Sequence, residues 1–156
     1  HLHKPVRTGI SLSVSGTESQ VNINVKAHFG VNYNDNLNLT VYLVEDNLVY
    51  DQTNYYNDDP SSVYYQAGAI MTGFIHRNTM IATATDMFGD HIPADSIDID
   101  KVYELNFQVS SIHVTNFNNL KVVAFVSYAS GAKKDQVINS LVCGFNQDSE
   151  SSLIDN

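Results

Sequence analysis

The sequence predicts an all-β fold, an antiparallel β-sandwich of immunoglobulin-like or jelly-roll type with about seven to nine strands. Three observations predict it: apolar and polar residues alternate along much of the chain, turn signals separate the alternating stretches, and no stretch has the pattern of a three-turn amphipathic helix. With 156 residues, 43% of them hydrophobic, we expect one hydrophobic core. Periodicity is compatible with both sandwich types.

The first strands have one apolar and one polar face. In "ISLSVS" (10–15) isoleucine, leucine and valine alternate with serines, and "VNINVKAHF" (21–29) repeats the pattern with asparagines opposite. The intervening "SGTES" predicts a hairpin turn. A third strand is predicted in "LNLTVYLVE" (37–45).

The middle of the chain predicts one strand between two polar connections. Alternation in "TMIATAT" (79–85) predicts the strand, and a tyrosine-rich polar loop over residues 50–65 precedes it. The connection that follows contains Gly89 and Pro93, which mark a structural turn. We expect a positive φ at Gly89, and we expect Pro93 to fix the direction in which the chain leaves.

The last strands close the sandwich. "YELNFQV" (103–109) alternates, but the phase changes at Ser110–Ser111, which predicts a β-bulge or a strand that crosses to a second sheet. "LKVVAFVSY" (120–128) is nearly continuously apolar and predicts a central strand covered on both faces, with "QVINSLVCGF" (136–145) as its neighbour after the turn "ASGAKKD". The predicted organisation is a single sandwich domain over 1–146 and a polar tail over 147–156.

Charge and composition exclude several classes of function. Seventeen acidic residues against eight basic ones give a formal net charge of -9, which repels phosphate backbones, so we expect no nucleic-acid partner. No apolar run approaches the roughly 20 residues that span a bilayer. The single cysteine, Cys143, excludes an internal disulfide and a multi-thiolate zinc site. No phosphate-binding glycine loop occurs, and we expect no cofactor.

Catalytic and metal chemistry have weak candidates. His76, Asp86, Asp90 and His91 are suitable residue types for a metal-dependent enzyme, but neither H-E-x-x-H nor His-x-His spacing is present. The hypothesis of a metal-dependent enzyme at His76, Asp86 and Asp90 requires the three side chains to converge in a pocket. No G-x-S-x-G nucleophile motif occurs. We therefore favour a protein that is not an enzyme.

A calcium site is the alternative interpretation of "DSIDID". Asp95, Asp98 and Asp100 offer hard oxygen ligands, although the glycine and the distal glutamate of an EF-hand loop are missing. The competing interpretation is a short edge strand in which Ile97 and Ile99 face inward and the aspartates face solvent.

The most suggestive binding feature is a cluster of tyrosines in the loop over 50–65. Tyr55, Tyr56, Tyr64 and Tyr65 surround "NDDPSS". Rigid aromatic rings on loops stack on sugars or peptide side chains at low entropic cost, so the loop predicts a carbohydrate- or peptide-binding site. The competing interpretation is a loop folded back over the sandwich and pinned there by half-buried tyrosines.

Three stretches in order resemble the outer-membrane-protein-28-like family of Bacteroidetes surface lipoproteins. "LTVYLVEDNLVYDQ" (39–52) resembles a family strand that ends in Glu-Asp and is followed by a Gln. "FIHRNTMIATATDMFGDHIP" (74–93) is similar to a Tyr-x-His-Asn-His stretch running into a Gly-acidic-x-Ile-Pro turn, and "NLKVVAFVSYASGAKKDQVINSLVC" (119–143) to the closing strand pair. Arg77 and Asn78 stand where the family often has Asn and His.

The resemblance covers roughly residues 8–145 and implies a location outside the cytoplasm, at the outer membrane or cell surface. The start "HLHKPVRTG" has no apolar signal region, so we expect either a cytosolic protein or a mature or excised fragment. The resemblance implies the second, the C-terminal β-domain of a lipoprotein with a thioredoxin-like domain before it. The predicted function is a non-catalytic module with a binding or spacer role; the alternative is a carbohydrate- or peptide-binding module using the tyrosine-rich loop.

Overall fold

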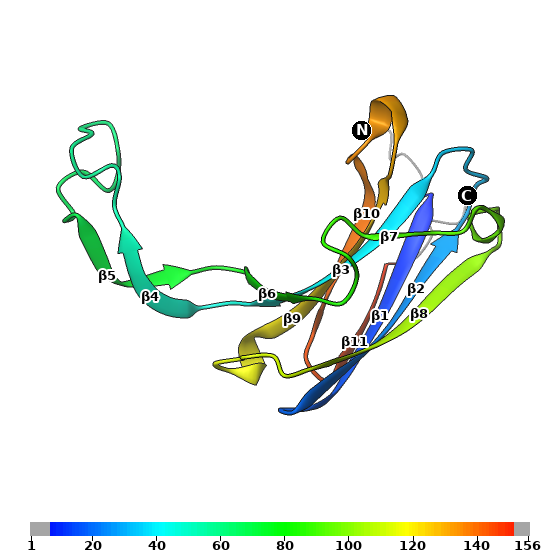
Figure 1. The fold of residues 1–156 in the computed structure, drawn as a ribbon, viewed down its shortest axis with the longest axis horizontal. Helices are drawn as coiled ribbons and strands as arrows, with labels where there is room; N and C mark the ends of the chain where they lie inside the picture. Colours follow the sequence, from blue (N-terminus) through cyan, green and yellow to red (C-terminus); the bar gives the residue numbers. More distant parts are fainter. Residues whose placement is uncertain (1–6, 152–156) are drawn as a thin grey trace.

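The computed structural model describes residues 7–151 and is all-β, as the sequence predicts. Two antiparallel sheets pack face to face, and a separate two-stranded ribbon extends from one of them (Figure 1). The two sheets contain nine of the eleven strands found in these residues, and the ribbon accounts for the other two. Within residues 7–151 no helix is long and apolar enough to cross a membrane.

The first sheet has the order β11-β1-β2-β8. Its strands are β1 (Thr8–Thr17), β2 (Gln20–Phe29), β8 (Val102–Ser110) and β11 (Gln147–Ser151). The alternation in β1 and β2 sends serines and asparagines to the outer face. The apolar residues of both strands face inward and are at most 2% exposed: Ile10, Leu12, Val14, Val21, Ile23, Val25, Ala27 and Phe29.

The second sheet has the order β10-β9-β3-β6, with β7 also pairing to β3. Its strands are β3 (Leu37–Glu45), β6 (Thr79–Thr83), β7 (Asp90–His91), β9 (Leu120–Tyr128) and β10 (Val137–Gly144). The inward residues of β3 and β9 complete the core: Leu37, Leu39, Val41, Leu43, Leu120, Val122, Ala124 and Val126. Full burial of one such aliphatic side chain contributes about 1.5–3 kcal/mol.

Several predictions of local structure need correction. The phase change at Ser110–Ser111 is neither a bulge nor a continuing strand, because β8 ends at Ser110 and Ser111 turns the chain with φ of +59°. The chain then reaches the second sheet through a short 3-10 helix, η2 (Phe117–Asn119). β9 is central in its sheet, but the outer residues Val123 and Phe125 are only partly buried, so it is not covered on both faces.

The polar tail predicted over 147–156 is also wrong where the structure describes it. Gln147–Ser151 is strand β11, which pairs antiparallel with β1 from Val14↔Gln147 to Ile10↔Ser151. Residues 152–156 lie outside the described residues. "QDSES" contains no apolar residue, so alternation could not predict this strand. The strand lies at the edge of the sheet and is held by backbone pairing with β1.

The ribbon consists of β4 (Leu48–Thr53) and β5 (Ile70–His76), which pair only with each other among the described strands. β4 continues the direction of the chain from β3, and β5 leads into β6, so the ribbon is an extension of the second sheet. Figure 1 shows it reaching away from the sandwich. The loop over 54–69 lies at its far end and is not folded back over the sandwich, which removes that interpretation.

Candidate functional site

The ribbon begins at two asparagines, one in each connection between the ribbon and the second sheet. Asn47 lies between β3 and β4, and Asn78 lies between β5 and β6. They adopt left-handed conformations with φ of +58° and +47°. Asparagine tolerates this region better than most residues. One left-handed residue in each strand therefore ends the second sheet and starts the ribbon.

Asp46 holds these two connections together. Its Oδ1 accepts hydrogen bonds from the backbone amides of Asn47 at 2.9 Å and Asn78 at 3.3 Å, and its Oδ2 lies 3.2 Å from Nζ of Lys121 on β9. Arg77 adds a second cation, with Nη1 3.8 Å from Oδ1. The hydrogen bond from Lys121, followed by those from the two amides, lowers the pKa of Asp46. One carboxylate thus connects both strands of the ribbon to the sandwich.

One face of the ribbon carries a row of rings. Tyr50 pairs with Phe74, and His76 lies 5.1 Å from Phe74 and 6.4 Å from Tyr50 between ring centroids. Tyr64 from the end loop continues the row, 6.2 Å from Phe74 in an edge-to-face arrangement. Nε2 of His76 is buried without a hydrogen-bond partner. His76 therefore packs as an aromatic ring in this row.

The opposite face of the ribbon is aliphatic. Val49 and Ile75 form a cross-strand pair, and they are 60% and 49% exposed. An isolated two-stranded ribbon buries little apolar surface of its own and is marginally stable in water. Because both faces of the ribbon carry apolar side chains and nothing in residues 7–151 covers the aliphatic face, much of the ribbon's apolar surface is in contact with solvent.

The loop over 54–69, which we call the tip, is held by its own hydrogen bonds. The side-chain amide of Asn54 donates to the carbonyls of Tyr64 at 2.9 Å and Gly68 at 3.0 Å, while its oxygen accepts from the amide of Tyr56 at 3.0 Å. Asn57 accepts from the amide of Gly68 at 2.9 Å. The tip is a compact loop with a defined conformation.

Asp59 stabilises the turn within the tip. Its Oδ1 accepts from the amide of Ser61 at 2.9 Å and from the hydroxyl of Ser61 at 2.7 Å. These bonds lower the pKa of Asp59. The main polar side chains of the tip are thus engaged in holding the loop.

A small apolar pocket of about 180 Å³ lies where the tip meets the ribbon. Both strands and the tip contribute to its lining, which consists of Gln52, Thr53, Asn54, Tyr55, Tyr56, Tyr64, Met71 and Phe74. The three tyrosines of this lining were expected from the sequence, whereas Met71 and Phe74 were not. These two residues reach the pocket because β5 pairs with β4. Alternation in either strand alone does not reveal that pairing.

The tip exposes large side chains to solvent. Tyr55, which lines the pocket, is 87% exposed, and Val63 on the same loop is 91% exposed. Tyr65 also lies at the surface beside Gln66, whose side chain donates to the Tyr65 hydroxyl at 3.2 Å. The structure therefore places all four predicted tyrosines on the tip. Only Tyr55, Tyr56 and Tyr64 line the pocket.

The three side chains of the enzyme hypothesis, His76, Asp86 and Asp90, are not brought together, and neither is His91. His76 belongs to the ring row on the ribbon, whereas Asp86, Asp90 and His91 belong to the connection around β7. There Oδ1 of Asp90 accepts from the amide of Asp86 at 3.0 Å. Within residues 7–151 no group of three or more His, Cys, Asp or Glu side chains is arranged to hold a metal ion.

The stretch "DSIDID" is not an edge strand, so that expectation is wrong. Asp95 lies in the 3-10 helix η1 (Ala94–Ser96), and Asp100 adopts a left-handed turn with φ of +63°. Ile97 is buried at 4% exposure while Ile99 is 51% exposed, because the chain turns between them. Asp95, Asp98 and Asp100 thus occupy a turn and do not form a metal cluster among the described residues.

Gly89 lies in the turn before β7 with φ of +87°. A Cβ at this position would lie 2.4 Å from Oγ1 of Thr40 and 3.0 Å from the carbonyl oxygen of Leu39. Pro93 follows the buried Ile92 and precedes η1 with φ of −56°. Close approach to β3 therefore explains why glycine occupies this turn.

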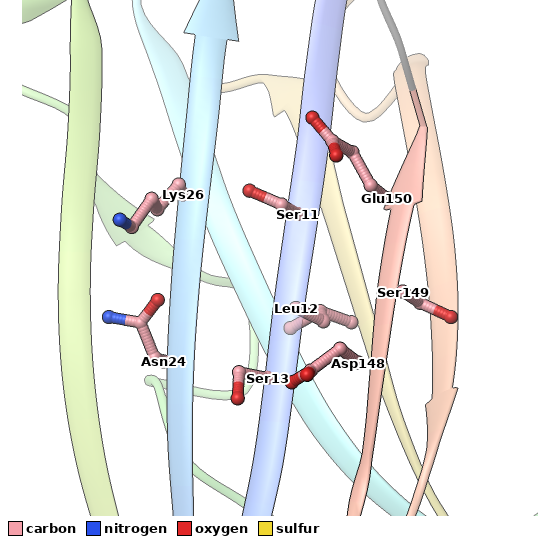
Figure 2. A pocket seen from close by; sticks show the side chains of 8 residues that line it. All are labelled: Ser11, Leu12, Ser13, Asn24, Lys26, Asp148, Ser149 and Glu150. Atoms are coloured by element: carbon pink, nitrogen blue, oxygen red, sulfur yellow. The ribbon is translucent and has the colours of Figure 1, made fainter.

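The outer face of the first sheet has a shallow polar hollow of about 340 Å³. Figure 2 shows Ser11 and Ser13 on β1 between the larger side chains of β2 and β11. Strand pairing produces two rows, Glu150–Ser11–Lys26 and Asp148–Ser13–Asn24. Small serines between larger residues create the hollow. It has no aromatic ring, and it is typical of a solvated sheet face.

Comparison with known proteins finds a matching family and a solved structure with a similar fold. The profile of the family described as "Outer membrane protein Omp28" matches residues 3–144. The structure is similar to the crystal structure of a domain of the outer membrane lipoprotein Omp28 from Porphyromonas gingivalis, with a TM-score of 0.57 and 13% sequence identity over 90% of this chain and 89% of that chain. None of the curated proteins matches the sequence.

Proposed function

Because this chain belongs to the Omp28 family of outer membrane proteins, we propose that it is a non-catalytic binding module whose contact surface is the tip of the ribbon. Like the other proteins of this family, it is associated with the outer membrane. The thioredoxin-like domain implied by the sequence resemblance stays a prediction.

One observation carries the proposal: the apolar pocket at the tip stands away from the sandwich, and the loop that helps to line it exposes the large apolar side chains of Tyr55 and Val63. Large apolar side chains in contact with solvent and grouped around a hollow are typical of interaction sites. A tip that served only as a spacer would gain nothing from exposing Tyr55 and Val63.

The chemistry of the pocket favours a peptide over a carbohydrate. Sugar recognition needs free polar groups beside the aromatic ring to bond the hydroxyls. Asn54, which lines the pocket, uses both its amide and its oxygen to hold the loop, and Oδ1 of Asp59 accepts two bonds from Ser61. Tyr55, Met71 and Phe74 are left to make contact. An apolar or aromatic side chain of a peptide or protein fits such a lining.

The fixed conformation of the tip also supports binding. A loop already held by hydrogen bonds loses little conformational entropy when a partner docks. Tyrosine rings add contact area with only two side-chain torsions to immobilise. The tip therefore combines exposed apolar area with a low ordering cost.

Panning a random phage-displayed peptide library on the immobilised protein tests the proposal. We expect enrichment of peptides with aromatic or aliphatic anchors. The chain has no tryptophan, so binding of a tryptophan-containing peptide can be followed by its emission without background from this residue type. We expect affinity to fall at least tenfold in Tyr55→Ser and Tyr56→Ser.

Phe88→Ser is the matched control, because Phe88 is 83% exposed but lies in the connection between β6 and β7, on the sandwich. It should leave the affinity unchanged. Equal losses in the tip and control variants would contradict the proposal. Binding on a glycan array that depends on Tyr55, with no enrichment of peptides, would replace the peptide with a carbohydrate.

A further inference from the structure

The first sheet has a free edge at β8. This strand pairs with β2 along its whole length, from Val102↔His28 to Ser110↔Gln20, without a register shift. Among residues 7–151 no strand pairs with its other side. Figure 1 shows β8 at the outer edge of the sandwich, on the side away from the ribbon.

This edge lacks the features that normally prevent pairing with another chain. β6 and β10 both have register shifts, and β11 is only five residues long and carries Asp148 and Glu150. β8 has nine residues, with no proline, glycine or bulge. Its single charged residue, Glu104, is already engaged by its own sheet: Nζ of Lys26 lies at 3.5 Å, and Asn24 donates to the carboxylate at 2.6 Å. Regular edge strands without such protection are templates for pairing.

The core is incompletely covered beside this edge. The inward residues of β2 are at most 1% exposed, whereas those of β8 are only partly buried: Tyr103, Leu105, Phe107 and Val109. A further strand beside β8 would place another row of inward side chains about 4.8 Å away. The same added strand would satisfy the outward backbone groups and cover the edge of the core.

We propose that β8 joins two copies of this chain edge to edge, antiparallel, about a two-fold axis at Asn106. This register pairs all nine residues of each strand. Leu105 then faces Phe107 of the second copy, and Tyr103 faces Val109. On the outer face Glu104 lies opposite Gln108, so no like charges meet across the axis.

A second copy of this chain is the partner that fits the free edge of β8. Its own edge offers the apolar inward row that the first copy needs and an outer row in which Glu104 meets the uncharged Gln108, and isologous pairing is the commonest symmetry of protein oligomers. The first sheet would become continuous across eight strands. The two ribbons would point to opposite ends of the dimer, because each leaves its sandwich on the side away from β8 (Figure 1).

Gln108 provides a pair of opposite variants for the test. It is exposed on the outer face of β8, so neither variant disturbs the core. Gln108→Lys places a cation opposite Glu104 twice in each dimer, and Gln108→Glu places like charges there. We expect sedimentation equilibrium to show that the native protein forms a dimer with twice the mass of the 17.3 kDa chain. Gln108→Lys should lower the dissociation constant of the dimer about two- to thirtyfold, and Gln108→Glu should raise it by a similar factor.

A cysteine at the axis gives an independent readout. Asn106→Cys would bring two thiols within the Cα separation that a disulfide allows, so oxidised glutathione should produce a covalent dimer. Asn22→Cys on β2 is the control, because its counterpart would lie at least three strand spacings, about 14 Å, away. The native Cys143 is buried and does not compete.

The outcomes separate clearly. Opposite shifts in the Gln108 variants together with a disulfide only at position 106 support the proposal, and the cysteine result alone decides if a Gln108 variant fails to fold. A chain that stays monomeric at hundreds of micromolar overturns it. So does a dimer that is insensitive to both Gln108 variants, since that dimer uses another surface. Neither result depends on what the tip binds.

Discussion

Asp46 and Lys121 form an ion pair with 3.2 Å between Oδ2 and Nζ, and this pair ties the base of the ribbon to the neighbouring strand β9. Asp46 is the second residue of the Glu-Asp pair that ends β3. The first, Glu45, points into the sandwich and is 1% exposed. Two adjacent carboxylates thus fix two different connections, one on each side of the sheet.

Asp46→Asn should loosen the ribbon while leaving the sandwich folded. The variant keeps one acceptor oxygen but loses the charge that attracts Lys121 and Arg77. We expect faster amide hydrogen exchange in β4 and β5 and little change in β1, β2 and β9. Asp35→Asn, which removes the more exposed pair of Asp35 and Lys133 at 3.3 Å, is the control and should leave the ribbon unchanged. Uniform acceleration throughout the chain would contradict a local role.

Acid should have the same effect as this substitution. Lys121 and the two amides hold the pKa of Asp46 below its ordinary value of 3.8, so the folded state binds the proton less readily than the unfolded state. The stabilisation is present above the unfolded pKa and is lost as pH falls through the lower folded pKa. Exchange in the ribbon should therefore quicken only below about pH 4. Acceleration already at pH 6 would implicate another group.

Glu45→Ala should destabilise the sandwich. Its carboxylate accepts from the backbone amides of Thr115 at 3.0 Å and Asn116 at 2.6 Å, and the substitution leaves both donors without a partner. We expect a loss of about 3 kcal/mol in the free energy of unfolding by urea. Glu45→Gln retains one acceptor oxygen and should lose less. An unchanged urea midpoint in Glu45→Ala would show that water replaces the carboxylate without cost.

Gly89→Ala tests the turn before β7. The added Cβ meets Oγ1 of Thr40 at 2.4 Å and is attached to a backbone with φ of +87°. We expect a loss of roughly 2 kcal/mol or more. Gly131→Ala is the matched control, because its φ is +75° and no atom lies within 4 Å of the added Cβ. It should lose only the conformational part, about 1 kcal/mol. Equal losses would mean that the contact with Thr40 relaxes freely.

The sandwich was predictable because burial on one face imposes a period of two. From Val21 to Phe29 every second residue is buried, and the residues between them are polar. The same argument failed at Ile97 and Ile99, where alternation occurs in a turn and only Ile97 reaches the core. Sequence alternation records which side chains are apolar. It does not record where the backbone reverses.

The ribbon was not predictable from the same pattern. Tyr50 and Val49 lie on opposite faces of β4, and both are exposed, so no buried face imposes a period. The tyrosines of the tip were recognisable by type, but Met71 and Phe74 join them only through strand pairing. Local sequence predicts the kind of residue in the candidate site, and the tertiary arrangement decides its members.

The most direct test of the central claim is to map a bound peptide onto the protein. Backbone amide NMR spectra of the protein would be recorded with and without the tryptophan-containing peptide enriched in panning. We expect chemical-shift changes confined to residues 52–56, 63–66 and 71–74, around the pocket of the tip. Changes centred instead on the polar hollow of Ser11, Ser13 and Asp148, with none at the tip, would contradict the assignment of the ribbon as the contact surface.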